Sequence, residues 1–172
     1  NAGITISHDS GLKLGIFGNE INTNSTDTTG EDGFEATWYA TYAMGPIAVG
    51  YQQSFVNRGI GGAAEAAGTN KTVAAATGSF EADQYSITMN VNDNLSVSYA
   101  KADDTYNAGA GAAGGSTTGG GGVADVTMSM TSIQAAYSMG SMSIKAYRTK
   151  TDNGAYNSGG GSTQRNEIAL GL

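Results

Sequence analysis

The sequence of 172 residues has no cysteine, one proline and few charged side chains, which make up 13% of the chain. Without cysteine there is no disulfide framework, no thiolate-bound metal and no cysteine nucleophile. The net charge of -7 and the pI near 4.4 argue against nucleic-acid binding, because phosphate contacts require clustered Lys and Arg. No run of about 18 apolar residues occurs, so we expect no transmembrane helix.

Most of the polarity that is present is neutral. Gly accounts for 27 residues and the mean hydropathy is -0.24, since Ser, Thr, Asn and Gln supply the polar groups. The stretch YSITMNVNDNLSVSYAK (residues 85–101) alternates apolar residues with small polar ones on both sides of a short turn. This period of two predicts a β-hairpin with one apolar face and one nearly uncharged polar face.

The same alternation recurs along the chain, and we count about nine strands without a helical stripe. The other seven segments are residues 4–7, 12–17, 34–44, 47–55, 126–130, 141–147 and 165–172. Short turns alternate strictly with long connections at 22–32, 57–78, 103–122 and 151–161. We therefore predict a single all-β domain over residues 1–172, an antiparallel up-and-down sheet with two unlike ends.

Strands with one apolar and one polar face are typical of transmembrane β-barrels, in which lipid contacts one face and water the other. Hydroxyl and amide groups hydrogen-bond to water in a lumen, whereas a dry core would penalise them. We therefore expect a wall of pore-lining side chains: Lys13, Glu35, Gln52, Ser86, Thr88, Asn90, Ser96, Ser98, Lys145, Arg165 and Glu167. The alternation also assigns Thr127 and Ser129 to the lumen, Met128 and Met130 to lipid, and Tyr85 and Tyr99 to an interfacial girdle at the loop end of their hairpin.

The hairpins YAMGPIAVGYQQSF (residues 42–55) and AAYSMGSMSIKAYR (residues 135–148), with the ending IALGL, resemble the C-terminal half of Gram-negative porins of the alphaproteobacterial general-diffusion type. The resemblance implies a sixteen-stranded, homotrimeric barrel in the bacterial outer membrane. It implies contact with membrane lipid and lipopolysaccharide, no cofactor, and passive diffusion of small hydrophilic solutes and ions. Lys145, Arg165 and Glu167 would then contribute to a transverse field across the channel.

Two features depart from that family. The odd strand count leads us to expect a barrel that is incomplete at the N-terminus, since single-chain bacterial barrels have even counts. The chain stops at Leu172, whereas porins commonly finish on an aromatic residue.

An alternative from another class is a soluble or cell-surface β-sandwich of adhesin type, which would bury the apolar stripe against a second sheet. An enzyme is not expected, because His8 is the single histidine and no nucleophile–base pair is apparent, so we assign no catalytic and no metal site. Acidic residues are expected in the long loops, where they would hydrate the rim or bind divalent cations: Asp27, Glu31, Asp32, Asp103, Asp104 and Asp152.

Overall fold

The computed structural model describes residues 1–21, 33–57, 79–107, 126–157 and 161–171, which form nine strands in one sheet. The strands are β1 (Ala2–Ser7), β2 (Leu12–Ile21), β3 (Gly33–Met44), β4 (Ile47–Asn57), β5 (Ser79–Asn90), β6 (Leu95–Asn107), β7 (Val126–Met139), β8 (Met142–Asp152) and β9 (Ser162–Gly171). A 3-10 turn, η2 (Gly154–Tyr156), lies between β8 and β9.

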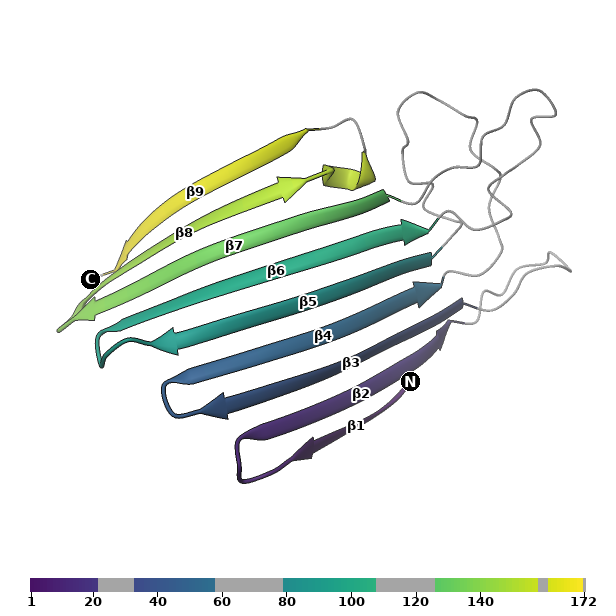
Figure 1. Cartoon of the computed structure of the whole chain (residues 1–172), viewed down its shortest axis with the longest axis horizontal. Coiled ribbons are helices and arrows are strands. Elements are labelled where there is room, and N and C mark those ends of the chain that lie inside the picture. Colours follow the sequence, from purple (N-terminus) through teal and green to yellow (C-terminus); the bar gives the residue numbers. More distant parts are fainter. Residues whose placement is uncertain (22–32, 58–78, 108–125, 158–160, 172) are drawn as a thin grey trace, which may run out of the picture.

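Each strand pairs antiparallel with the next, in the order β1 to β9, as the alternation predicted (Figure 1). The short turns after β1, β3, β5 and β7 lie at one end of the sheet, here the turn end. The long connections leave from the opposite end, the loop end. The all-β, up-and-down prediction is therefore confirmed.

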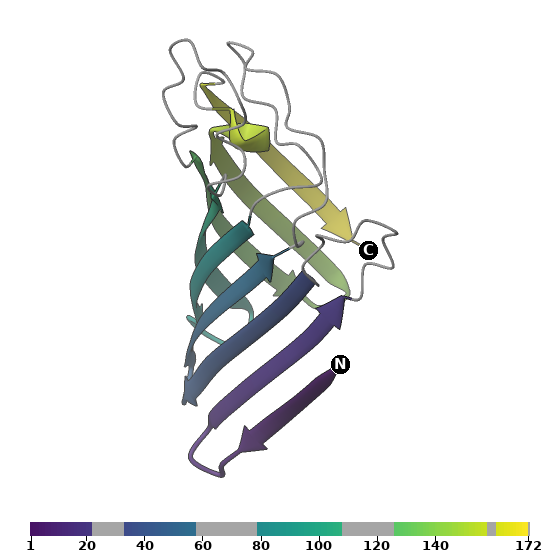
Figure 2. The same cartoon turned by 90° about the vertical axis from the view of Figure 1, so that its right-hand side faces the viewer.

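The sheet is curved and open (Figure 2). Within the described residues β1 and β9 are the two edges and do not pair with each other. Both edge strands run from the loop end toward the turn end, because eight reversals of direction separate them. The described part of the chain contains no helix long and apolar enough to cross a bilayer.

The pairing register assigns every strand residue to one of the two faces, because paired residues share a face and successive residues alternate. A hollow spans the neighbouring strands β3 to β7 on the face that carries Gln52, Ser86 and Ser132. We call this the concave face. The opposite, convex face carries Tyr51, Ile87 and the residues in register with them.

The sheet encloses almost no core. Among the described residues the buried hydrophobic side chains are Tyr106, 7% exposed, and Val126, 5% exposed. Large apolar side chains elsewhere remain open to the surroundings, up to 74% for Ile168 and 73% for Leu170. The strands are therefore held together by their backbone ladders and by neighbouring side chains, and the described segments supply no second layer over the sheet.

Two glycines let aromatic rings lie flat on the concave face. The Phe17 ring lies over Gly3 and the Tyr39 ring over Gly15, its cross-strand partner in each case. A Cβ at either glycine would overlap the ring. The two rings stack with centroids 6.3 Å apart, so this corner of the wall is smooth and closely packed.

Several expectations about strand ends and faces are wrong. β6 continues to Asn107 and β8 ends on Asp152, so Asp103, Asp104 and Asp152 are strand residues rather than loop residues. Tyr85 and Tyr99 consequently lie in mid-strand instead of at the loop end of their hairpin. The acids Asp27, Glu31 and Asp32 lie outside the described residues.

The face assignment at the start of β7 is also wrong. Met128 pairs with Asp104 and Met130 with Ala102, which puts both methionines on the concave face. Thr127 and Ser129 lie on the convex face instead. Along β7 the apolar side chains lie on the convex face near the turn end but on the concave face near the loop end. The alternation near the turn end therefore does not predict the face of residues near the loop end.

Candidate functional site

All eleven side chains predicted to line a pore lie on the concave face of the open sheet. Near the turn end, Thr88 pairs with Ser98 and Asn90 with Ser96, which gives a row of small hydrogen-bonding groups. Next to them, Gly50 has no side chain and Ala100 and Ala102 carry only methyl groups. This surface is polar, nearly uncharged and free of bulk.

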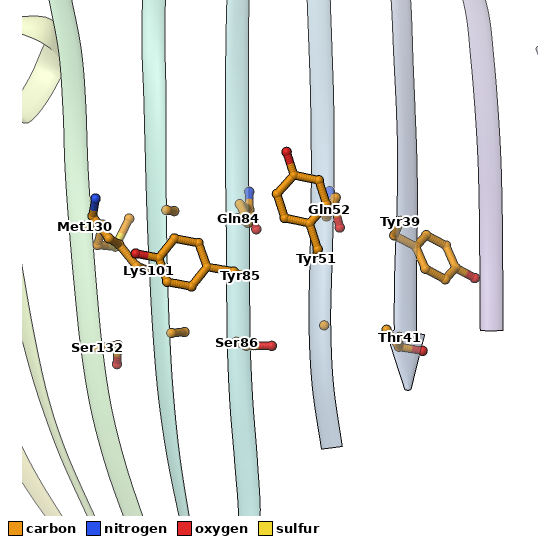
Figure 3. Close-up of a pocket in the computed structure, with 13 residues that line it drawn as sticks. Tyr39, Thr41, Tyr51, Gln52, Gln84, Tyr85, Ser86, Lys101, Met130 and Ser132 are labelled. Carbon is orange, nitrogen blue, oxygen red and sulfur yellow. The ribbon is translucent and has the colours of Figure 1, made fainter. Parts of the chain in front are cut away.

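The centre of this surface is a shallow hollow of about 440 Å³ (Figure 3). Gln52, Gln84 and Ser86 offer amide and hydroxyl groups on its floor, between Tyr39 on one flank and Met130 on the other. Tyr39 is directed from β3 toward β2, away from the middle of the hollow. The hollow is open to solvent and suits water and small polar solutes, because its lining provides amide and hydroxyl groups and a single charged residue, Lys101.

The charged members of the predicted set do not form one cluster. Arg165 and Glu167 form an ion pair of 2.8 Å on β9, and the Tyr147 hydroxyl donates to Glu167 at 2.5 Å. Lys145 lies on the adjacent β8, whereas Lys13 lies on β2 at the other side of the sheet. Lys145, Arg165 and Glu167 are thus neighbours, as expected, but one of the two cations is already paired with the acid.

The convex face carries a continuous apolar surface over its turn-proximal half, which we call the convex apolar band. Its exposed members project from every strand except β6: Ile4, Ile6, Leu12, Leu14, Ile16, Trp38, Tyr42, Met44, Val49, Tyr85, Ile87, Met89, Ile133, Tyr137, Met139, Met142, Ile144, Ile168 and Leu170. No described residue covers this band.

Aromatic side chains with polar tips mark the upper border of the band. Trp38 packs against Tyr51 with ring centroids 5.1 Å apart, and its indole N–H donates to Gln53 at 3.0 Å. The Tyr51 hydroxyl donates to Asp83. Each ring therefore lies with its body on apolar neighbours and its polar atom directed to the polar part of the sheet, which is the arrangement found at membrane–water interfaces.

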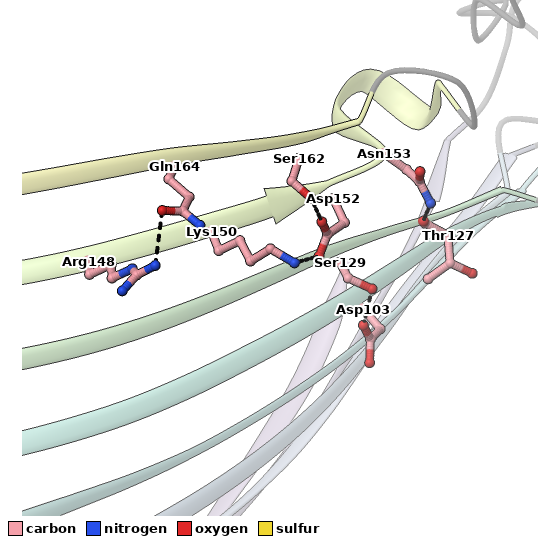
Figure 4. Close-up of polar contacts among 9 residues, drawn as sticks. All are labelled: Asp103, Thr127, Ser129, Arg148, Lys150, Asp152, Asn153, Ser162 and Gln164. Carbon is pink, nitrogen blue, oxygen red and sulfur yellow. Dashed lines mark hydrogen bonds and ion pairs between the residues drawn. The ribbon is translucent and has the colours of Figure 1, made fainter.

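Beyond this border, toward the loop end, the convex face of β5 to β9 is polar and paired (Figure 4). Asp83 and Asp103 oppose each other in register. Asp103 accepts from Lys101 at 2.6 Å and from Ser129 at 2.6 Å, which offsets the repulsion between the two carboxylates. Sequence reasoning missed Asp83, because the apolar and polar residues exchange faces between Tyr85 and Ser79 and the alternation then looks broken.

The ends of β8 and β9 are joined by a second polar group. Lys150 and Asp152 form an ion pair of 2.9 Å, and Arg148 donates to Gln164 at 3.0 Å (Figure 4). Ser162 donates a hydrogen bond to Asp152. This region is therefore charged, unlike the convex apolar band.

On the concave face the polarity changes in the opposite direction, from polar near the turn end to apolar near the loop end. Near the loop end Phe80, Tyr106 and Val126 form an apolar cluster, with the Phe80 and Tyr106 rings 5.0 Å apart. Tyr156 of η2 joins it from above. No sequence signal identified this cluster, because its members come from separate strands and from a connection.

In the part of the chain that the structure describes, no group of three or more His, Asp or Glu side chains is arranged to hold a metal ion. His8 accepts from the Ser10 backbone at 3.1 Å within the β1–β2 turn, which is a local turn contact. Comparisons with family models, with curated proteins and with solved structures found no match to this chain.

Proposed function

We propose that this chain forms part of the wall of a porin-like channel in the outer membrane of a Gram-negative bacterium. Small hydrophilic solutes and ions would diffuse passively along the concave face, with lipid and lipopolysaccharide around the convex face. The observation that carries the proposal is one curved sheet with an exposed apolar band on the convex side and small hydroxyl and amide groups on the concave side.

The convex apolar band would be unfavourable in water unless another apolar layer covers it. Soluble monomers rarely expose contiguous apolar patches larger than a few hundred Å², because each Å² of apolar surface in water costs about 25 cal/mol. Acyl chains would remove this cost around the whole sheet. A β-sandwich would need a second protein layer on the same band, and no described residue supplies one.

The strand lengths also favour a membrane. A strand tilted by about 45° needs roughly 9–11 residues to cross the hydrocarbon. Strands β2 to β9 have between 10 and 14 residues, whereas strands of soluble proteins average about 5–6. The border of Trp38, Tyr51 and Tyr85 then corresponds to the interface on the loop side.

A membrane-embedded sheet must close, because hydrocarbon offers no partner for the backbone groups of edge strands. Since β1 and β9 run in the same direction, an antiparallel closure requires an odd number of further strands. Seven would give the sixteen that the resemblance to porins implies. Two copies of the sheet joined about the barrel axis would instead place β1 beside β9 in parallel, which argues against closure by dimerisation.

The composition of the concave wall suggests that the channel would discriminate only weakly between solutes of different charge. Most of its groups are neutral, so solute size would matter more than charge. Lys13, Lys145 and Arg165 supply positive charge, and Glu35 and Glu167 supply negative charge. The proposed homotrimeric assembly rests on the sequence resemblance to porins.

The test is single-channel recording from the full-length protein in a planar lipid bilayer. We expect stepwise, ohmic conductance. Thr88→Trp should lower the step size because it adds bulk to the concave face, and the matched variant Ile87→Trp on the convex face should leave it unchanged. A protein that inserts without conducting, or equal steps in both variants, would contradict the proposal.

A further inference from the structure

The connection between β8 and β9 folds back onto the concave face at the loop end. We call residues 153–157 the 153–157 hook. The Tyr156 hydroxyl donates to Asp104 on β6 at 2.6 Å. The Asn153 amide donates to the backbone carbonyl of Thr127 on β7 at 2.9 Å (Figure 4). The hook is therefore fixed by side-chain contacts to two strands beyond its own.

Aromatic packing adds a third attachment. The Tyr156 ring meets the Phe80 ring of β5 edge-on at 5.4 Å and the Tyr106 ring of β6 at 6.1 Å. Tyr106 and Val126 are the two buried hydrophobic residues of the described chain, and Tyr106 lies directly beneath Tyr156. The most closely packed part of the sheet is thus the place where the hook rests on the wall.

The backbone of the hook is strained in order to reach this position. Asn153, Ala155 and Tyr156 adopt left-handed conformations with φ of 53°, 54° and 55°. Such angles are uncommon for residues with a Cβ and persist where surrounding contacts hold them. Ala155 is exposed, whereas Asn153 and Tyr156 on either side of it are half-buried.

We propose that the 153–157 hook is a constriction of the channel and that Tyr156 is a specificity-determining residue for solute size. The hook adds a layer to the concave wall that is about one aromatic ring deep, given the 5.4 Å between the Tyr156 and Phe80 rings. The passage is narrowed at the loop end, where solutes enter, whereas nearer the turn end the concave face of β5 and β6 carries Ser86, Thr88 and Ser98. This inference rests on the proposed channel function.

Two variants change the constriction in opposite directions. Tyr156→Ala removes the ring and its bond to Asp104, so the passage should widen. Ala155→Trp adds bulk at an exposed position without touching the attachments, so the passage should narrow. Tyr137→Ala removes an aromatic ring from the convex face of β7 and serves as the matched control.

The full-length protein and each variant are reconstituted in liposomes, and swelling rates are measured for a monosaccharide, a disaccharide and a trisaccharide. We expect Tyr156→Ala to raise the disaccharide-to-monosaccharide ratio, Ala155→Trp to lower it, and Tyr137→Ala to match the parent. If the parent admits solutes but both hook variants have the parent's ratio, the constriction is wrong and the channel function stands. A parent that admits no solute would overturn the channel function itself. Folding of each variant is judged by gel mobility before and after heating. If Tyr156→Ala fails to fold, the swelling ratio of Ala155→Trp tests the constriction, and an unchanged ratio overturns it.

Discussion

A charge placed on the convex apolar band should destabilise the protein far more than the same charge one residue away. Ile87 is 44% exposed and lies between Val49 and Tyr99 in register, inside the band. If lipid covers this position, an Arg near mid-depth costs about 2–4 kcal/mol. If water covers it, the change should stay within about 0.5 kcal/mol, as for most surface substitutions.

Thr88→Arg is the matched control, because Thr88 follows Ile87 on β5 and lies on the concave face. The assay is equilibrium folding of the full-length protein into lipid vesicles against urea, followed by tryptophan fluorescence. We expect Ile87→Arg to lower the folding free energy by about 3 kcal/mol, or roughly two decades in the equilibrium constant. Thr88→Arg should remain close to the parent. Equal losses in the two variants, or a larger loss for Thr88→Arg, would refute the assignment of the faces.

Three further outcomes are expected. Gly15→Ala should cost about 1–3 kcal/mol of stability, because the new Cβ overlaps the Tyr39 ring and forces it from the wall; a urea titration that matches the parent would show that the ring is not held there. Lys145→Glu should shift the reversal potential in a salt gradient toward cation preference, whereas Arg148→Glu on the convex face should not; equal shifts would mean that both side chains sense the same compartment. Lys101→Gln should lower stability slightly, and more at low salt, because it removes the ammonium group that pairs with Asp103 opposite Asp83; a loss independent of salt would point to packing instead of charge.

The local pattern was informative where one face is uniformly apolar. Around Ile87 and Val97 the alternation fixes which side chains share a face, because a slip of one residue would move the whole set to the other side. The order of short turns and long connections likewise predicted the antiparallel neighbours, since a two- to four-residue turn can join only adjacent strands.

The same pattern failed near the loop end, for a physical reason. There the concave face has its own apolar cluster and the convex face carries Asp83, Asp103 and Lys101, so hydropathy changes face in mid-strand. A pattern of period two cannot reveal such an exchange without the partner strands. The contact between Tyr156 and Asp104 joins residues 52 positions apart, and no local signal predicts it.

Cysteine scanning along β5 tests the central claim most directly, because the 172 residues contain no cysteine and each introduced thiol is unique among them. Single cysteines at positions 84 to 90 are reacted with a water-soluble maleimide in reconstituted vesicles, and a fluorophore on each is then quenched by brominated lipid. We predict that positions 86, 88 and 90 react readily and escape quenching, while positions 87 and 89 react slowly and are quenched. Uniform labelling along the strand, or the opposite phase, would contradict a wall with lipid on its convex side and water on its concave side.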